Sequence, residues 1–347
     1  MKKLTILLCM ILGLLFAACG SKSVTDHAVQ EESGTEQSSS VQTEDMDNED
    51  MTQTSAQSDQ EAALRQYADT VPIVYMTEEI SSKSLVNLYR SLDEKMKGNH
   101  TAVKISAGEL PSGNNLEPEL FRELVQVVEG TIVTCSTRDD LQPAENSKLS
   151  EIAKVTVLDE DGSQTIPVED GLHLKENYVG NHFSEYDGLL VISYFQGHAA
   201  AGFDGAVKNV SVGISSAEGK CLIYSAGSSD TDPRGANQDT FLESMAEAGK
   251  SVTDAMNGNV LYMNIMNQRS IDGGFDDTAS ERDGREIGVL ASADPVALDQ
   301  ACVDFVYMED GNETFVNWME KLNGEYALEY AEKIGLGSSA YTLVSID

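Results

Sequence analysis

The chain has 347 residues and carries 58 acidic against 23 basic side chains, a formal net charge of −35. A protein this acidic has little with which to neutralise phosphates, which argues against nucleic acid as a partner. Only three cysteines follow residue 19, at positions 135, 221 and 302, and they form no CxxC pair. We therefore expect no iron–sulfur cluster and no cysteine zinc site, and we expect these cysteines to be small buried hydrophobes.

The first 19 residues are typical of a bacterial lipoprotein signal. Lys2 and Lys3 precede an apolar core, Leu4–Phe16, that is too short to read as a membrane-spanning helix. Two alanines then lead into Cys19, which resembles a lipobox. We expect cleavage before Cys19, a lipid on that residue and anchoring to the extracytoplasmic face of the cell membrane. The alternative is an ordinary signal peptide with a chance cysteine.

Residues 20–68 are rich in Ser, Thr, Gln, Glu and Asp and almost free of aromatic side chains. Such a segment buries too little apolar surface to offset its ordering entropy, so we expect a disordered acidic linker. Residues 69–347 are long enough to form a sizeable core and are expected to be one α/β domain.

In this domain, apolar runs of strand length alternate with segments of helical periodicity. The alternation over 71–135 is typical of a parallel sheet covered on both faces, and we expect an α/β fold with a mixed, mostly parallel sheet flanked by helices. The predicted strands are 71–76, 101–106, 131–135, 154–158, 188–193, 260–266, 285–291 and 342–346. The predicted helices are 84–97, 118–128, 237–256, 294–307, 313–322 and 325–333.

The stretch 191–220 concentrates residues suited to a functional site. A strand is followed here by a glycine-rich loop, the place where open α/β sheets position ligands. Glycine lets the backbone approach a ligand closely, and a neutral imidazole suits proton transfer. The alternative is a plain glycine-rich connection in which the histidine is structural. The candidate residues are His198, Gly202, Gly205, Lys208 and Asn209.

These residues resemble the central motif of the DUF362 family of prokaryotic proteins. The motif is matched by Ser193–His198, Ala201–Phe203, Gly205–Asn209, Gly213 and Ala217–Lys220. A second segment, Ile287–Gln300, and a looser one from Val103 to Pro118 extend the likeness over about residues 72 to 308. Lys104 matches an early lysine of the family, which implies a second cationic contact for an anionic ligand. Asp294 opens the C-terminal helix as its cap and is a secondary site candidate.

The chain also departs from that family. Many members carry a ferredoxin-like insert, whose cysteines are missing here. Members often show a Cys-Asp-Cys triplet where this chain has Gly273-Gly274-Phe275. Because these cysteines are missing, we expect neither the iron–sulfur cluster nor the thiol pair that the resemblance would otherwise imply.

The spacing His-x-x-Ala-Gly-Phe-x-Gly-x-x-Lys is also similar to that of the nickel-pincer lactate racemase family. There the lysine holds the cofactor covalently and the histidine is an acid/base, which implies these roles for Lys208 and His198. A histidine sixteen residues after the lysine ligates nickel, and Tyr224 stands at that position. A phenol in place of imidazole would weaken such a transition-metal or pincer-type site.

Other acidic and histidine side chains are weaker candidates. A Ca²⁺ site or a solvated loop would suit Asp272, Asp276, Asp277, Glu281 and Asp283. Asp299 and Asp304 lie on different faces of their helix, so they form no carboxylate pair, although Asp299 could face the site. His173 and His182 precede the central strand, and either could reach the candidate site.

Two hypotheses follow. The first is a lipoprotein with a small-molecule or cofactor site around His198 and Lys208, with the reaction unassigned. The second is a ligand-binding lipoprotein that kept the fold and lost the chemistry.

Overall fold

The computed structural model describes residues 70–92, 96–106, 118–136, 148–267, 271–272, 286–309 and 311–347. The chain divides into a segment Met1–Val71 and a body Pro72–Asp347. The predicted signal, lipobox and linker lie outside the described residues, as does the acidic cluster of residues 272 to 283 apart from the backbone of Asp272. Among the described residues, no helix has the length and apolarity that a membrane span requires.

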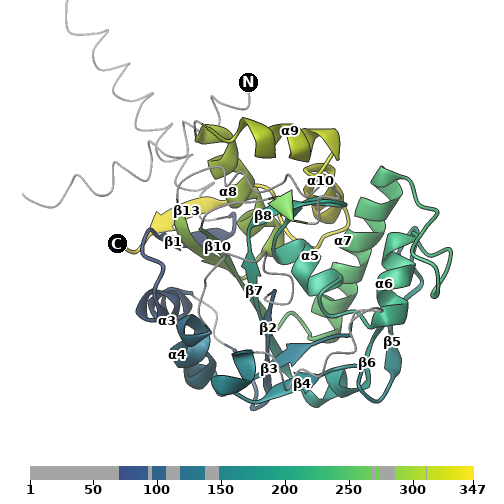
Figure 1. The fold of residues 1–347 in the computed structure, drawn as a ribbon, viewed down its shortest axis with the longest axis horizontal. Coiled ribbons are helices and arrows are strands. Elements are labelled where there is room, and N and C mark those ends of the chain that lie inside the picture. Colours follow the sequence, from purple (N-terminus) through teal and green to yellow (C-terminus); the bar gives the residue numbers. More distant parts are fainter. Residues whose placement is uncertain are drawn as a thin grey trace, which may run out of the picture. The chain divides into compact units, whose positions relative to one another are not determined.

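An eight-stranded sheet forms the centre of the body (Figure 1). Its strand order is β13-β1-β12-β10-β7-β2-β3-β4. Seven strands share one direction and only β12 runs against its neighbours, which confirms the predicted mixed, mostly parallel sheet. The strands are β1 (Ile73–Thr77), β2 (Thr101–Ile105), β3 (Gly130–Thr134), β4 (Val155–Val157), β7 (Gly188–Tyr194), β10 (Val260–Met266), β12 (Gly288–Ser292) and β13 (Thr342–Ser345).

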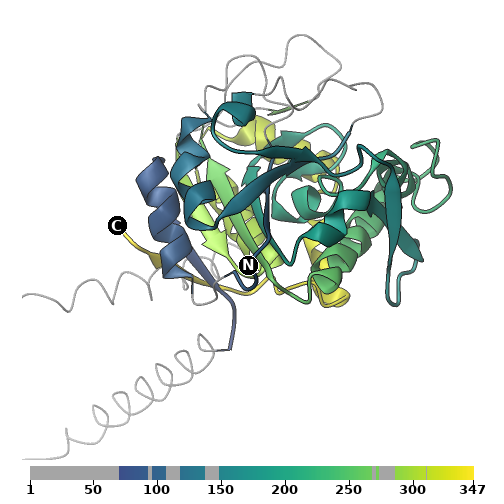
Figure 2. The same cartoon turned by 90° about the horizontal axis from the view of Figure 1, so that it is seen from below.

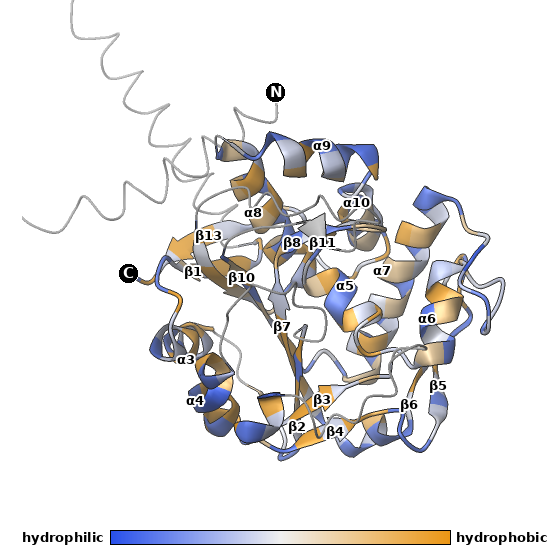
Figure 3. Ribbon diagram, in the orientation of Figure 1, coloured by the Kyte–Doolittle hydropathy of each residue, from blue (hydrophilic) through white to orange (hydrophobic). Residues whose placement is uncertain are grey.

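Two helical layers cover this sheet. Because side chains along a strand alternate between its two faces, each strand contributes apolar side chains to both layers. In β7, Leu190 and Ile192 pack towards α3 (Ser82–Ser91) and α4 (Glu119–Val127), while Leu189 and Val191 join the core on the other face. Figure 2 shows the α3–α4 layer on one side of the sheet, and Figure 3 shows the apolar colour of the strands between the layers. The other layer contains α5 (Ala206–Ser211), α7 (Gln238–Ala255) and α8 (Pro295–Met308).

Caps explain where several helices begin. The Ser81 side chain accepts a hydrogen bond from Ser84 N, and Ser81 N donates one to Ser84 Oγ, which forms a capping box. As a result α3 begins two residues before its predicted start. Asn237, the first residue of the predicted helix, caps α7 through Thr240 N. The remaining helices are α6 (Ala217–Tyr224), α9 (Glu313–Lys321), α10 (Tyr326–Lys333), and the short 3₁₀ turns η3 (Lys148–Glu151) and η4 (Asn181–Glu185).

The structure adds elements that the sequence pattern does not predict. The region before β7 contains a hairpin of β5 (Ser163–Pro167) and β6 (Glu176–Gly180). The glycine-rich stretch after β7 is not a loop, because it forms β8 (Gln196–His198), β9 (Gly202–Asp204) and α5. With β11 (Ile271–Asp272), β8 and β9 make a second, three-stranded sheet.

Candidate functional site

Polar side chains interrupt the apolar core at the carboxyl ends of three neighbouring parallel strands. Lys104 on β2, Ser193 on β7 and Asn264 on β10 all lie on the sheet face that α5 covers, because the residues two positions earlier belong to that same core. Ser193 and Asn264 are register partners. Cys135, directly after β3, packs against the same core.

A second set of polar side chains faces these residues from the helices. Asn209 of α5 donates from Nδ2 to the carbonyl of Ile192 and to Ser193 Oγ, both at 3.1 Å. Gly213 lies close to the sheet, since a β-carbon there would be 3.0 Å from Lys104 Cε. We call the combined set the polar layer. It comprises Lys104, Cys135, Ser193, Asp204, Lys208, Asn209, Lys220, Asn264 and Asp299.

An ion pair connects the end of β9 to the first turn of α5. Lys208 Nζ lies 3.2 Å from Asp204 Oδ2, and both side chains are about nine-tenths buried, at 10% and 8% exposure. Asp204 Oδ1 is also buried and finds no hydrogen-bond partner within the described parts of the chain. A buried charge pair of this kind is costly to break from one side, because the remaining ion stays desolvated.

Asp299 of α8 holds the N-terminus of α5. Its carboxylate accepts from Ala206 N at 2.7 Å, from Val207 N at 2.9 Å and from Asn264 Nδ2 at 2.7 Å. Burial raises the pKa of Asp299 to about 7, and these three donors oppose the rise. The Asp299 carboxyl thus sits near the boundary between its neutral and ionised forms at neutral pH.

Lys104 and Lys220 are two further lysines of the polar layer, in addition to Lys208 with its Asp204 partner. Lys220 of α6 donates from Nζ to the carbonyl of Ser136 at 2.7 Å, and Lys104 donates to the carbonyl of Ile105 at 3.2 Å. Burial lowers the pKa of Lys104 from 10.5 to about 8, and the charges of Lys220 and Lys208 add to that effect. Cys135 and Asp204 act in the opposite direction.

Cys135 belongs to this group but stays a thiol. Its Sγ donates to the carbonyl of Ile214 at 3.1 Å. Burial raises the pKa of Cys135 to about 12, although Lys220 and Lys104 lower it. Cys221 and Cys302 are buried, whereas Cys135 is half-buried.

His198 lies at the end of β8, half-buried. Its Nδ1 accepts from Ala200 N at 3.2 Å and Ala201 N at 3.1 Å, and its carbonyl accepts from Trp318 Nε1 at 3.0 Å. Gln196 opposes Asp204 and His198 opposes Gly202 across β8 and β9, so the pleat puts His198 on the face of Asp204, about 7 Å further along the strand. The histidine thus lies on the same face as Asp204, further along the strand, and also holds a turn.

Close packing explains why glycine stands at positions 202 and 205, and a helix cap explains Asp294. Gly202 has φ +85, and a β-carbon there would be 2.9 Å from Gly324 Cα. At Gly205 a β-carbon would be 2.5 Å from Asp299 Oδ1, so the absence of a side chain lets that carboxylate reach α5. Asp294 caps α8 as predicted. It follows β12, which is antiparallel to β10, so it lies near the amino-terminal end of β10, whereas the polar layer lies at the carboxyl end.

The remaining sequence candidates have partners of their own. His173 Nε2 lies 2.5 Å from Glu243 Oε2, and His182 Nδ1 lies 2.6 Å from Glu185 Oε1. Asp304 accepts from Gln300 and Tyr341.

The residues present do not fit a nickel-pincer group. Tyr224, at the position of the nickel-ligating histidine, stacks on Phe241 with ring centroids 4.8 Å apart. Its phenol is also a poor substitute for imidazole at a nickel site. Across the described ranges, no three His, Cys, Asp or Glu side chains lie close enough to hold a metal ion.

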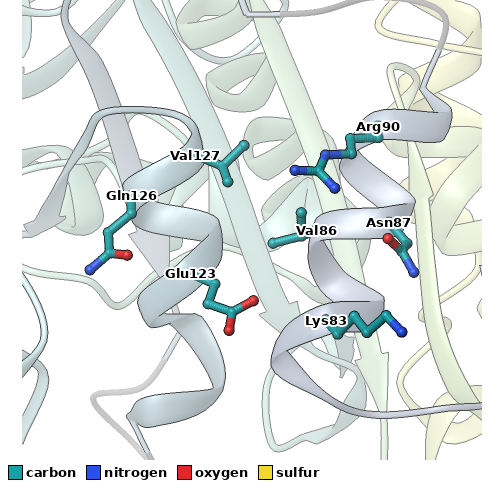
Figure 4. Close-up of a pocket in the computed structure, with 7 residues that line it drawn as sticks. All are labelled: Lys83, Val86, Asn87, Arg90, Glu123, Gln126 and Val127. Carbon is teal, nitrogen blue, oxygen red and sulfur yellow. The ribbon is translucent and has the colours of Figure 1, made fainter.

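A groove of about 330 Å³ lies on the other face of the sheet, between α3 and α4 (Figure 4). It is separate from the polar layer, because Val86 of its lining packs in the α3–α4 core. Its lining residues are Lys83, Val86, Asn87, Arg90, Glu123, Gln126 and Val127.

Sequence reasoning did not select Lys220, Cys135, Asp204 or Asn264 as site residues. For Asn264 the strands held a usable signal. Like Lys104 and Ser193, it is a polar residue at an inward position near the end of an apolar strand. For Asp204, the i, i+4 spacing to Lys208 was the signal.

The model of the family described as domain of unknown function (DUF362) matches residues 101–304. A search of curated proteins finds none that matches. Among solved structures, the lactate racemase apoprotein from Thermoanaerobacterium thermosaccharolyticum is 15% identical with a TM-score of 0.39, covering 67% of this chain and 56% of that one. A protein from Thermotoga maritima is 15% identical with a TM-score of 0.38, covering 74% and 59%. This chain thus spans less than two thirds of each of these two structures. The family match covers more than half of the chain, which belongs to the DUF362 family.

Proposed function

We propose that this DUF362 protein binds a small anionic molecule in the polar layer, and that a lipid on Cys19 anchors it to the extracytoplasmic face of the membrane. One observation carries the proposal for the site. In a chain with a net charge of −35, Lys104, Lys208 and Lys220 lie near one another at the carboxyl ends of parallel strands. That edge of an open α/β sheet is where ligands bind.

The balance of charge in the polar layer supports an anionic ligand. Asp204 is engaged by Lys208, and burial raises the pKa of Asp299 to about 7. Three lysines therefore face one carboxylate that is already paired and a second one whose pKa is raised by burial. Burial is the main cause of the lowered pKa of Lys104, and the charges of Lys220 and Lys208 add to it. An anion between the lysines would offset that added repulsion.

His198 is the acid/base group of the proposal, since it lies on the same face of the small sheet as Asp204. The reaction is unassigned. The second candidate, a binding protein without catalysis, is favoured by the Nδ1 contacts that commit His198 to a turn and by Tyr224 in its aromatic stack.

Thermal unfolding of the full-length protein in detergent tests the site, with inorganic phosphate and oxalate as probes. At least one probe is expected to raise Tm, since a ligand that binds only the folded state stabilises it. Lys220→Gln should abolish the rise, whereas Lys154→Gln, at an exposed lysine, should keep it. No rise in the wild type, or an equal rise in Lys220→Gln, would overturn the proposal.

Labelling of cells with radioactive palmitate tests the anchor. The wild type is expected to incorporate label and sediment with membranes, and Cys19→Ala to do neither. Incorporation that survives Cys19→Ala would refute the lipid on that residue.

A further inference from the structure

Lys104 differs from the other two lysines of the polar layer in its contacts. Lys208 has a carboxylate at 3.2 Å, and Lys220 donates to a main-chain carbonyl at 2.7 Å. Lys104 Nζ donates to the carbonyl of Ile105 at 3.2 Å and, among the residues that the structure describes, has no carboxylate within ion-pair distance. A carbonyl contact of this kind satisfies a neutral amine as well as an ammonium.

The surroundings favour the neutral form. Lys104 lies between a buried core and two like charges, and Asp204, whose charge acts on it, is already paired with Lys208. With a pKa of about 8, about one Lys104 side chain in ten is an amine at pH 7 and about half at pH 8. A lysine desolvated beside other cationic groups is the arrangement that activates an amine as a nucleophile.

We propose that Lys104 is a nucleophile that forms an imine with the carbonyl group of a small anionic aldehyde or ketone, whose anionic group is held by Lys220. This inference rests on the proposed anion site and names the class of its ligand.

The chemistry needs no oxidant or further reactant. The lone pair of Nζ forms a bond to the carbonyl carbon, and the π electrons move to the carbonyl oxygen, which takes a proton. The carbinolamine then loses water as the C=N bond forms, so amine and carbonyl give imine and one water.

Position supports this assignment as well as charge. Lys104 Cε lies next to Gly213, at the end of the segment that carries Lys208. Lys104 pairs in register with Val133 of β3, and Lys220 Nζ donates to the carbonyl of Ser136, three residues further along that segment. A ligand of a few atoms can therefore contact Lys220 with its charged end and Lys104 with its carbonyl.

Reductive trapping of the full-length protein tests the inference. Glyoxylate, a small anionic aldehyde, is added with cyanoborohydride, and the modified lysine is found by mass spectrometry of peptides. We expect Lys104 to be modified well before the exposed Lys154, with an initial rate that rises as pH rises through about 8. Lys104→Arg keeps the charge and should lose the fast adduct, and Lys154→Arg should keep it.

Two outcomes are separable. If Lys104 is modified no faster than Lys154 while inorganic phosphate still raises Tm, the nucleophile is overturned and the anion site stands. If phosphate also has no effect on Tm, both the nucleophile and the anion site are overturned. The Tm of Lys104→Arg without added ligand, compared with that of the wild type, shows whether this variant folds.

Discussion

At the scale of single residues, Gly205 shows how close the packing is around the start of α5. A β-carbon there would come within 2.5 Å of the Asp299 carboxylate. Gly205→Ala is therefore expected to lower the free energy of unfolding by about 1–3 kcal/mol through overpacking. Chemical denaturation measures the change.

A second glycine provides the matched control. Gly249 lies inside α7, and the nearest atom to a β-carbon there is Val210 Cγ1 at 3.4 Å. Gly249→Ala should be neutral or stabilise by up to about 1 kcal/mol, because alanine costs less backbone entropy in a helix. Equal destabilisation by both substitutions would contradict the packing described for Gly205.

Asp299 should make stability depend on pH. Its folded pKa of about 7 lies above the ordinary 3.8, so the folded state binds this proton more tightly than the unfolded state. The resulting stability is present at low pH and lost as pH rises through about 7, with a slope of at most about 1.4 kcal/mol per pH unit.

Asp299→Asn removes this titration. The free energy of unfolding of the wild type relative to Asp299→Asn should be larger at pH 5 than at pH 8. A difference that stays constant between these two pH values would show that the carboxyl is ionised throughout.

Residues of the site were predictable where a motif or a strand end marked them. Lys104, Lys208 and Asn209 all lie in the polar layer. Lys220 could not be placed there, because it lies in α6 and its reach to Ser136, 84 positions earlier in the chain, depends on tertiary packing.

At the scale of elements, α8 has a cap that is independent of the polar layer. Asp294 accepts from Val296 N and Ala297 N at 2.9 Å, and also from Ser338 N at 2.9 Å. Asp294→Ala is expected to cost about 1–2 kcal/mol of stability. The rise in Tm with phosphate should be unchanged, and its loss would move Asp294 into the binding site.

Long elements could be predicted from periodicity, and short ones could not. The seven residues of β7 and the eighteen of α7 carry enough repeats to define strand and helix. The three-residue strands β8 and β9 and the six-residue α5 do not, so the sequence pattern of this stretch indicated a loop. The helix that carries Lys208 was therefore missed, although Lys208 itself was selected.

At the scale of the whole molecule, the sheet order depends on pairings that no local pattern encodes. β1 precedes β2 in sequence, yet β12, β10 and β7 lie between them. Alternating strands and helices predicted a mostly parallel sheet, but only tertiary contacts decide that β12 enters it antiparallel between β1 and β10.

The same scale explains why three lysines can act together in so acidic a protein. The charge of −35 belongs to the chain as a whole, whereas the polar layer lies under α5, away from most solvent. Local charge there is set by burial and by the nearest side chains.

The pKa of Lys104 tests this account most directly. Lysine labelled with ¹³C at Cε allows the titration to be followed by NMR in the full-length protein, with Lys104→Arg to assign the signal. We predict a pKa of about 8, which should rise when inorganic phosphate is added and also in Lys220→Gln, where one repelling charge is removed. A Lys104 that titrates near its ordinary 10.5, unmoved by phosphate or by Lys220→Gln, would contradict the convergence of the three lysines and the anion site built on it.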